Sequence, residues 1–140
     1  MLTNNAQEFR NFLISQGINL EFKEGNDGNV LVEIRESLEC GAKLRIGVVF
    51  DKEDSMVSIY GLEFIQGVNP SKKSYMYESI NDLNSTYTYY KFILNRDVVE
   101  IQAFALFNDN FNSEVLMRYI MGMMNVANSE FSNLMRVIWS

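Results

Sequence analysis

Hydrophobic and polar residues alternate with a period of two along much of the chain. Four segments in the first half show this alternation: 18–22, 30–35, 43–50 and 56–65. Clusters of turn-forming residues separate them at 25–28 and 51–54, and two further segments, 87–94 and 98–107, flank the turn 95–97. Short runs of this period with turns between them predict antiparallel strands that bury one face.

The pattern in segment 43–50 predicts most clearly which face of a strand is buried. One set of alternate positions is uniformly apolar, and it consists of Leu44, Ile46, Val48 and Phe50. The other set includes Lys43 and Arg45, which we expect to be exposed. A shift of one residue would exchange the two sets, so the expectation is easily checked.

Three segments have the 3.6-residue spacing of helices. The first is expected to begin with a capping box formed by Asn5 and Glu8 and to end at Gly17. The second follows Pro70, with Ser71 as its N-cap, and ends near residue 84. The third runs from residue 112 or 113 to the last residue.

The order of elements indicates the fold class. Strands cluster between helices instead of alternating with them, in the order α-β-β-β-β-α-β-β-α. This order predicts an α+β fold with an antiparallel sheet. A chain of 140 residues fits a single domain, 1–140.

The last helix carries two apolar lines. We expect the first to face the core, and it consists of Leu116, Ile120, Met123, Ala127, Phe131, Leu134 and Ile138. The second consists of Met117, Met121, Met135 and Trp139. Because Met and Trp are enriched at protein interfaces, the second line predicts a dimer or partner contact. The alternative is a helix so deeply cradled by the sheet that both lines are core.

Composition argues against catalysis and metal binding. The chain has no histidine and one cysteine, Cys40, so no histidine-based triad or base and no internal disulfide can form. The carboxylates lie at polar strand positions or in turns, and the acidic turn 51–54 lacks the spacing of a calcium loop. The glycine-containing turn 25–28 lacks a phosphate-loop lysine. We therefore expect no cofactor, no metal and no enzymatic activity.

The net charge of −6 also limits the partners. It argues against a binder that tracks nucleic-acid phosphates and against adsorption to an anionic membrane. The first residues lack the basic and apolar regions of a signal peptide, and no apolar run is long enough to span a bilayer, so we expect a cytoplasmic protein. Several tyrosines lie near lysines, a combination that can stack on single-stranded nucleic acid, but packing within the protein is favoured for Tyr75, Tyr77, Tyr87, Tyr89 and Tyr90.

The stretch from residue 75 to the end resembles the YbjN-type family of small bacterial proteins. The residues that carry the resemblance are those at 80–84 (Ile-Asn-Asp-Leu-Asn), 89–92 (Tyr-Tyr-Lys-Phe), 101 (Ile) and 135–139 (Met-Arg-Val-Ile-Trp). The resemblance implies a fold like that of type III secretion chaperones, which are acidic homodimers that bind extended segments of other proteins. It carries over only Asn81 and Asn84 as motif positions, and a capping or loop-tethering role is expected for Asn81.

These observations favour a non-enzymatic protein-binding module, chaperone-like or regulatory, that acts through a hydrophobic surface as a homodimer. One alternative is a phage- or mobile-element-encoded inhibitor that blocks a nucleic-acid enzyme with an acidic surface, which clustering of acids on one face would favour. A second is an enzyme that uses only carboxylate, lysine and tyrosine groups, which would need a pocket with convergent acids.

Overall fold

The computed structural model describes all 140 residues and has three α-helices and one antiparallel sheet of six strands. The elements are α1 (Asn4–Ser15), β1 (Phe22–Glu24), β2 (Val30–Ser37), β3 (Lys43–Phe50), β4 (Met56–Ile65), the 3-10 turn η1 (Pro70–Lys72), α2 (Lys73–Thr86), β5 (Lys91–Asn95), β6 (Val98–Leu106) and α3 (Ser113–Trp139). The predicted α+β class and the predicted order of helices and strands are confirmed.

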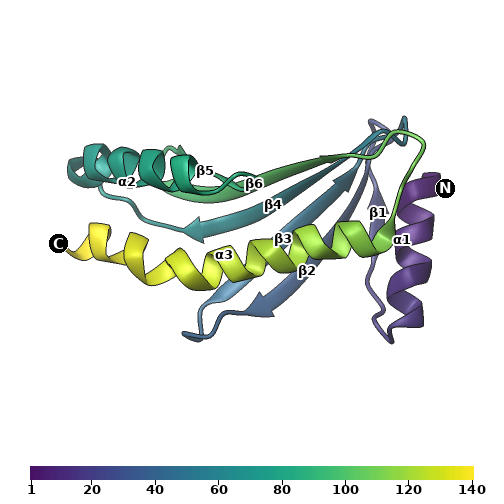
Figure 1. Ribbon diagram of the computed structural model, residues 1–140, viewed down its shortest axis with the longest axis horizontal. Coiled ribbons are helices and arrows are strands. Elements are labelled where there is room, and N and C mark those ends of the chain that lie inside the picture. The colour runs from purple at the N-terminus through teal and green to yellow at the C-terminus, as the bar shows by residue number, and fades with distance from the viewer.

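The strands follow the order β1-β2-β3-β4-β6-β5, and every neighbouring pair is antiparallel. The long helix α3 lies across one face of the sheet, with α1 at one end of the molecule and α2 at the other (Figure 1). The first and last residues lie at opposite ends of the long axis. None of the helices combines the length and apolar character that crossing a bilayer requires.

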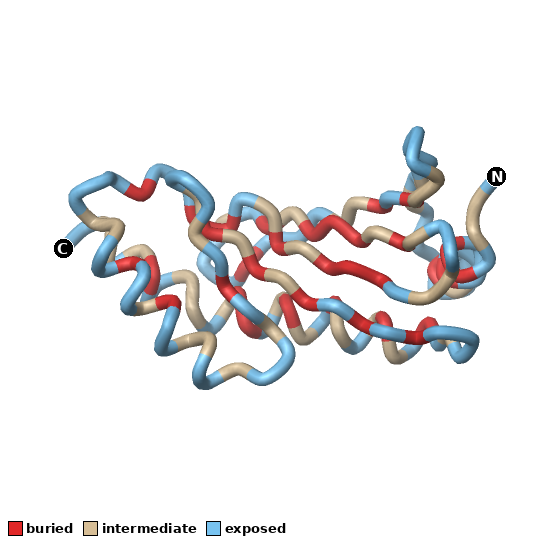
Figure 2. Tube along the Cα trace, turned by 90° about the horizontal axis from the view of Figure 1, so that it is seen from above, coloured by how far each residue is buried: buried red, intermediate tan, exposed pale blue.

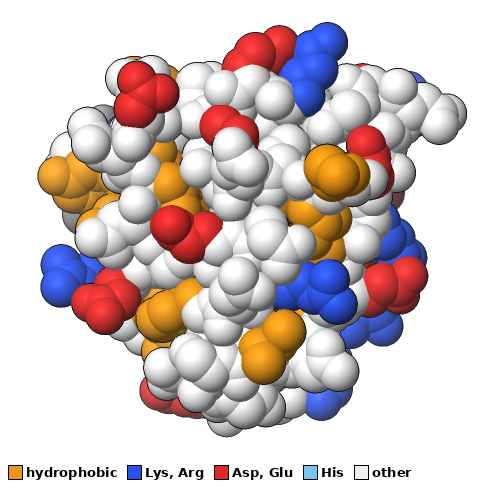
Figure 3. Space-filling model, turned by 90° about the vertical axis from the view of Figure 1, so that its right-hand side faces the viewer, with side chains coloured by type: hydrophobic (Ala, Val, Ile, Leu, Met, Phe, Trp, Pro, Cys, Tyr) orange, Lys and Arg blue, Asp and Glu red, His pale blue; other side chains and the backbone are white.

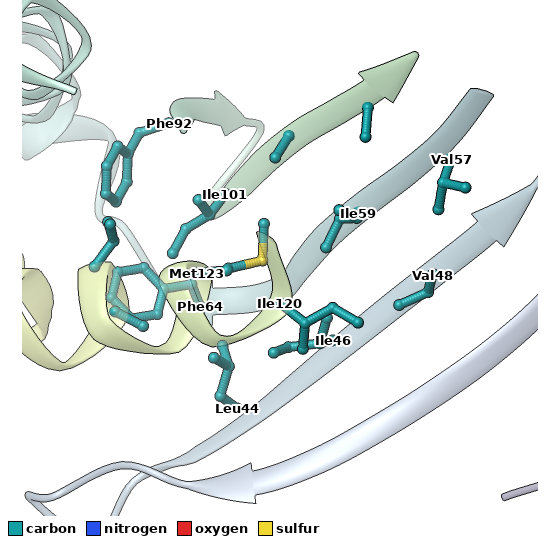
Figure 4. Close-up of a cluster of buried hydrophobic side chains, with 14 of the residues drawn as sticks. Leu44, Ile46, Val48, Val57, Ile59, Phe64, Phe92, Ile101, Ile120 and Met123 are labelled. Carbon is teal, nitrogen blue, oxygen red and sulfur yellow. The ribbon is translucent and has the colours of Figure 1, made fainter. Parts of the chain in front are cut away.

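A single cluster of 29 buried apolar residues forms the core between the sheet and the helices. Along the strands, buried positions alternate with more exposed ones (Figure 2). From α3, Ile120 and Met123 reach the inner face of the sheet at Ile46 and Ile59 (Figure 4). The predicted face of β3 is confirmed: its four apolar positions are at most 1% exposed, Lys43 is exposed, and Arg45 is partly exposed.

A β-bulge interrupts the pairing of β4 with β6. Gly61 lies opposite Ile101 and Ile65 lies opposite Val99, so β4 has two more residues than β6 over this stretch. Within the bulge Glu63 has a left-handed backbone, with φ of 49°. The extra residues allow two consecutive side chains of β4, Phe64 and Ile65, to join the same core, whereas regular alternation would place them on opposite faces.

The start of α1 differs from the prediction. Thr3 is the N-cap, because its Oγ1 accepts a hydrogen bond from the Ala6 N–H at 3.3 Å. Asn5 is buried and binds the β3–β4 turn instead: its N–H donates to Asp54 Oδ1 and its Nδ2 donates to the Asp54 carbonyl, both at 3.0 Å. The predicted capping box is therefore wrong, because a contact distant in sequence uses Asn5. The end at Gly17 is confirmed by its φ of 78°.

Three other predicted boundaries are also wrong. The strand expected at 18–22 is paired only from Phe22, because β1 matches just three residues of β2. The strand expected from 87 begins at Lys91, since the preceding tyrosines turn toward α3. Ser71 lies within η1 and does not cap α2. Asn69 is the N-cap of η1 and accepts from the Ser71 N–H at 3.0 Å, and α2 begins after Lys72 without a side-chain cap.

Candidate functional site

The outer face of the sheet carries no helix. The inner-face residues Phe50, Ile101 and Phe92 belong to the core that α1, α3 and α2 share, so all three helices lie on the same side. The opposite side, called the open face from here on, presents the other alternate set of strand residues to solvent.

Apolar side chains cross the centre of the open face from strand to strand. The strand register places Leu31 beside Val49, Val49 beside Ser58, and Ser58 beside Phe104, and it pairs Met56 with Leu106. Tyr60 meets Phe104 edge-on, with ring centroids 6.1 Å apart. The resulting apolar band consists of Leu31, Val49, Met56, Tyr60, Phe104 and Leu106.

The band is well exposed at its β6 end. Leu106 is 71% exposed and Phe104 is 51% exposed. Single exposed apolar residues are common on protein surfaces, whereas a contiguous group on one face marks an interaction surface. Gly47 lies in the middle of this face, and Leu62 and Leu31 from the two neighbouring strands pack over its backbone. A side chain at position 47 would press against Leu62, because its Cβ would lie 3.2 Å from Leu62 Cδ1.

Next to the band, four charged side chains form an ion cluster. Glu33 Oε2 accepts from Arg35 Nε at 2.8 Å, and Glu33 Oε1 accepts from Arg45 Nη2 at 2.9 Å. Arg45 Nη1 also lies 3.5 Å from Glu63 Oε1. Hydrogen bonds from Arg35 and then Arg45 lower the pKa of Glu33. The cluster holds two acids and two bases, so this part of the open face has no net charge.

The four residues of the second apolar line of α3 differ in how far they are exposed. Met121 is 51% exposed and Trp139 is 76% exposed, but Met117 and Met135 are only partly exposed and pack against the core. Between them the β2–β3 turn covers the helix, where Asn128 Oδ1 accepts from the Glu39 N–H at 2.8 Å. The sheet therefore reaches around part of this line, and Met121 and Trp139 remain as separate exposed side chains.

The core line of α3 is mostly as expected. Five of its members are buried: Leu116, Ile120, Met123, Ala127 and Leu134. Phe131 and Ile138 are partly buried and pack against the same core. Phe131 meets Phe64 of the β-bulge, with ring centroids 5.8 Å apart, so the bulge and the C-terminal half of the helix fit together.

The two asparagines of the family resemblance have different surroundings. Asn84 Nδ2 donates to the Phe92 carbonyl at 3.0 Å, and its Oδ1 accepts from the Phe92 N–H at 2.7 Å. Asn84 thus binds the outer edge of β5 as a neighbouring strand would and ties α2 to the sheet. Asn81 is exposed, and its side chain makes no hydrogen bond. The capping or tethering role expected of Asn81 is therefore wrong, and Asn84 has the geometry of a tether.

Four groups have clearly shifted pKa values, and Glu33 is one of them. Burial by itself raises the pKa of Asp51, but hydrogen bonds from Ser55 and Met56 to its carboxylate outweigh this effect, and the pKa is lowered. Burial, with Glu130 beside the hydroxyl, raises the pKa of Tyr87 to about 12, and burial raises that of Tyr90. Each shift has a structural cause within a turn or a contact between elements.

No three His, Cys, Asp or Glu side chains come together in a way that could hold a metal ion. Cys40 is exposed in the β2–β3 turn. Acidic and basic side chains are interspersed over the end of the molecule that carries α1 (Figure 3). That end gives no support to an inhibitor with a clustered acidic face.

The tyrosines correct one expectation. Tyr75, Tyr77 and Tyr89 are exposed instead of packed in the core. Tyr87 and Tyr90 do pack, and both bind α3: the Tyr87 hydroxyl donates to Glu130 Oε2 at 2.6 Å and the Tyr90 hydroxyl donates to the Tyr119 carbonyl at 2.9 Å.

Comparison of the chain with protein families, with characterised proteins and with solved structures gave no significant match.

The apolar band was not predicted from the sequence, although its signal is present there. Phe104 and Leu106 stand at alternate positions between Ala103, Ala105 and Phe107, so the last part of this strand, 103–106, is apolar in both phases. Leu31 and Val49 likewise occupy the phase that Glu33 and Arg45 mark as outward. Apolar residues in the outward phase of several strands could have predicted an exposed band.

Proposed function

We propose that this chain is a non-enzymatic protein-binding module, chaperone-like or regulatory, that acts as a homodimer with the open face as its dimer interface. The observation that carries the proposal is the apolar band on the side of the sheet that no helix covers. Two sheets that pack face to face bury such bands at a spacing of about 10 Å.

A second copy suits this face by both shape and charge. The band runs from β2 to β6 and the ion cluster spans β2, β3 and β4, so both of them include β3 and β4. A two-fold axis parallel to the strands would lay band on band and cluster on cluster, as in isologous dimers. Because the cluster contains both signs of charge, its carboxylates could meet the guanidinium groups of the second copy.

Such a dimer would keep the helices on its outside. Met121 and Trp139 would then stay uncovered in both copies, and these exposed side chains remain our proposed contacts for another protein. Aromatic and methionine side chains are common in such contacts. The resemblance to secretion chaperones, which pair as homodimers and bind protein segments, agrees with this division of surfaces.

The test compares two charge substitutions by sedimentation velocity over a range of concentrations. We expect the wild type to sediment as a dimer and Phe104→Glu to dissociate at least about a hundredfold more readily, because burying an unpaired carboxylate costs several kcal/mol. Met121→Glu is the matched control, with the same new charge at a side chain of equal exposure on the other side of the sheet.

Circular dichroism should show that both variants remain folded, since a solvated charge at an exposed position costs little. A concentration of 100 µM is on the order of the dissociation constant of a weak complex, so a wild-type protein that is still monomeric at this concentration would contradict the dimer. Dissociation by Met121→Glu and not by Phe104→Glu would instead place the interface on α3.

A further inference from the structure

A hollow of about 350 Å³ opens on the helix side of the molecule, away from the open face. It lies between the first half of α3 and the segment that leads from α2 into β5. Its lining residues are Tyr89, Tyr90, Val115, Arg118 and Tyr119. This volume falls in the range of sites that accept a small ligand or one or two side chains of a partner.

Contacts between the two segments fix the shape of the hollow. The Tyr90 hydroxyl donates to the Tyr119 carbonyl at 2.9 Å, and the Tyr89 ring meets the Tyr119 ring edge-on, with centroids 6.1 Å apart. Gly122 makes this approach possible, because a Cβ at that position would collide with the Tyr90 hydroxyl oxygen. Tyr90 and Tyr119 are therefore held in place before any ligand arrives, and the more exposed Tyr89 packs edge-on against Tyr119.

The chemistry of the hollow comes from one cation among aromatic rings. Arg118 is exposed and forms neither an ion pair nor a side-chain hydrogen bond, whereas Arg35 and Arg45 are paired with acids. No acidic residue lines the hollow. A guanidinium group binds a carboxylate with two parallel hydrogen bonds, and tyrosine rings pack against apolar groups.

We propose that this hollow binds an apolar carboxylate: a carboxylate group that pairs with Arg118, carried on an aromatic or branched aliphatic group that packs between Tyr89, Tyr90 and Tyr119. A phosphate fits less well, because the hollow offers only one cation and the chain has a net charge of −6. The carboxylate can belong to a free acid or to a peptide. The site is independent of the dimer interface proposed above.

Nuclear magnetic resonance titration of the ¹⁵N-labelled protein tests the proposal with four ligands. N-acetyl-phenylalanine carries the free carboxylate, and N-acetyl-phenylalanine amide is its neutral match. A blocked Glu-Phe dipeptide presents a side-chain carboxylate next to an aromatic ring, and phenyl phosphate presents a different anion. We expect N-acetyl-phenylalanine to bind with a dissociation constant on the order of 1 mM, typical for about fifteen non-hydrogen atoms.

The neutral amide should bind at least about tenfold more weakly, because a hydrogen bond to a charged group is lost. Tighter binding of the blocked dipeptide than of the free acid would identify peptides as the source of the carboxylate, and the reverse would identify free acids. Equal binding of acid and amide, or tenfold tighter binding of phenyl phosphate, would overturn the proposal, as would the absence of any shift at residues lining the hollow.

Two substitutions and one control locate the site. Arg118→Gln should weaken binding of the acid about tenfold and leave binding of the amide unchanged. Gly122→Ala should weaken both, because it displaces Tyr90. Arg136→Gln removes another exposed arginine of α3 and should have no effect. Unchanged binding by Arg118→Gln would refute the proposed role of Arg118, whatever the outcome of the sedimentation experiment.

Discussion

Replacing Asn84 with alanine removes both hydrogen bonds that close the outer edge of β5. The substitution leaves the N–H and carbonyl groups of Phe92 without partners, and Phe92 is only 1% exposed. An unsatisfied buried polar group costs about 1–3 kcal/mol. Two such groups at a partly accessible edge predict a loss of about 2–4 kcal/mol in the free energy of unfolding.

The higher helix propensity of alanine raises the free energy of unfolding and so partly offsets the loss of the two hydrogen bonds. A control substitution is needed to separate the two effects. Alanine is favoured over asparagine in a helix by about 0.5 kcal/mol. Asn81 lies three residues earlier in the same helix and is exposed, and its side chain makes no hydrogen bond. Asn81→Ala should therefore raise stability by about 0.5 kcal/mol. The difference between the two variants isolates the tether.

Urea unfolding followed by circular dichroism measures both free energies, and hydrogen exchange supplies a local reading. The Phe92 amide should be protected in the wild type and in Asn81→Ala and should exchange faster in Asn84→Ala. Equal stability of the two variants within about 0.5 kcal/mol, the usual scatter for surface substitutions, would refute the reasoning. An unchanged exchange rate at Phe92 would do the same.

Two further predictions concern acid stability and metal content. The folded state lowers the pKa of Asp51 from 3.8, so the stability that ionised Asp51 contributes is present above pH 3.8 and is lost as the pH falls through the lower folded-state pKa. Asp51→Asn should therefore reduce the free energy of unfolding in urea by about 1 kcal/mol at pH 7 and by less near pH 2.5. A reduction that does not depend on pH would contradict this. With no histidine and one cysteine, protein purified without chelators should contain no stoichiometric zinc or iron by elemental analysis, and a metal-to-chain ratio near one would show the prediction to be wrong.

The inner face of the sheet could be predicted because burial on one side imposes a strict period of two. Leu44, Ile46 and Val48 follow that period and are fully buried. The bulge at Glu63 could not be predicted, because it depends on how β4 pairs with β6, and regular alternation would place the consecutive side chains of Phe64 and Ile65 on opposite faces of the sheet. The local pattern of apolar and polar residues predicts that a strand forms, but it does not predict how that strand pairs with its neighbour.

Side chains with several possible partners show the same limit. Thr3 and Asn5 are both good N-cap residues, and the distant Asp54 turn decides between them by binding Asn5. The apolar band has a similar origin. Phe104 alone is an ordinary exposed residue, and it becomes part of a surface only when the register places it in one row with Leu31 and Val49.

The edges of the sheet strengthen the argument for association through its open face. A sheet can pair with another chain along a free edge strand or across a face. At one edge, β1 offers only three residues, and two of them are the charged Lys23 and Glu24. At the other, Asn84 already occupies the N–H and carbonyl groups of Phe92 in the short strand β5.

Neither edge therefore presents a long run of free backbone groups, whereas the open face presents six apolar side chains without a cover. The contact expected of this chain is thus one between side chains across two sheet faces, and it should respond to a charge at Phe104. Strand addition would instead depend on the backbone of β5 and would be insensitive to that charge.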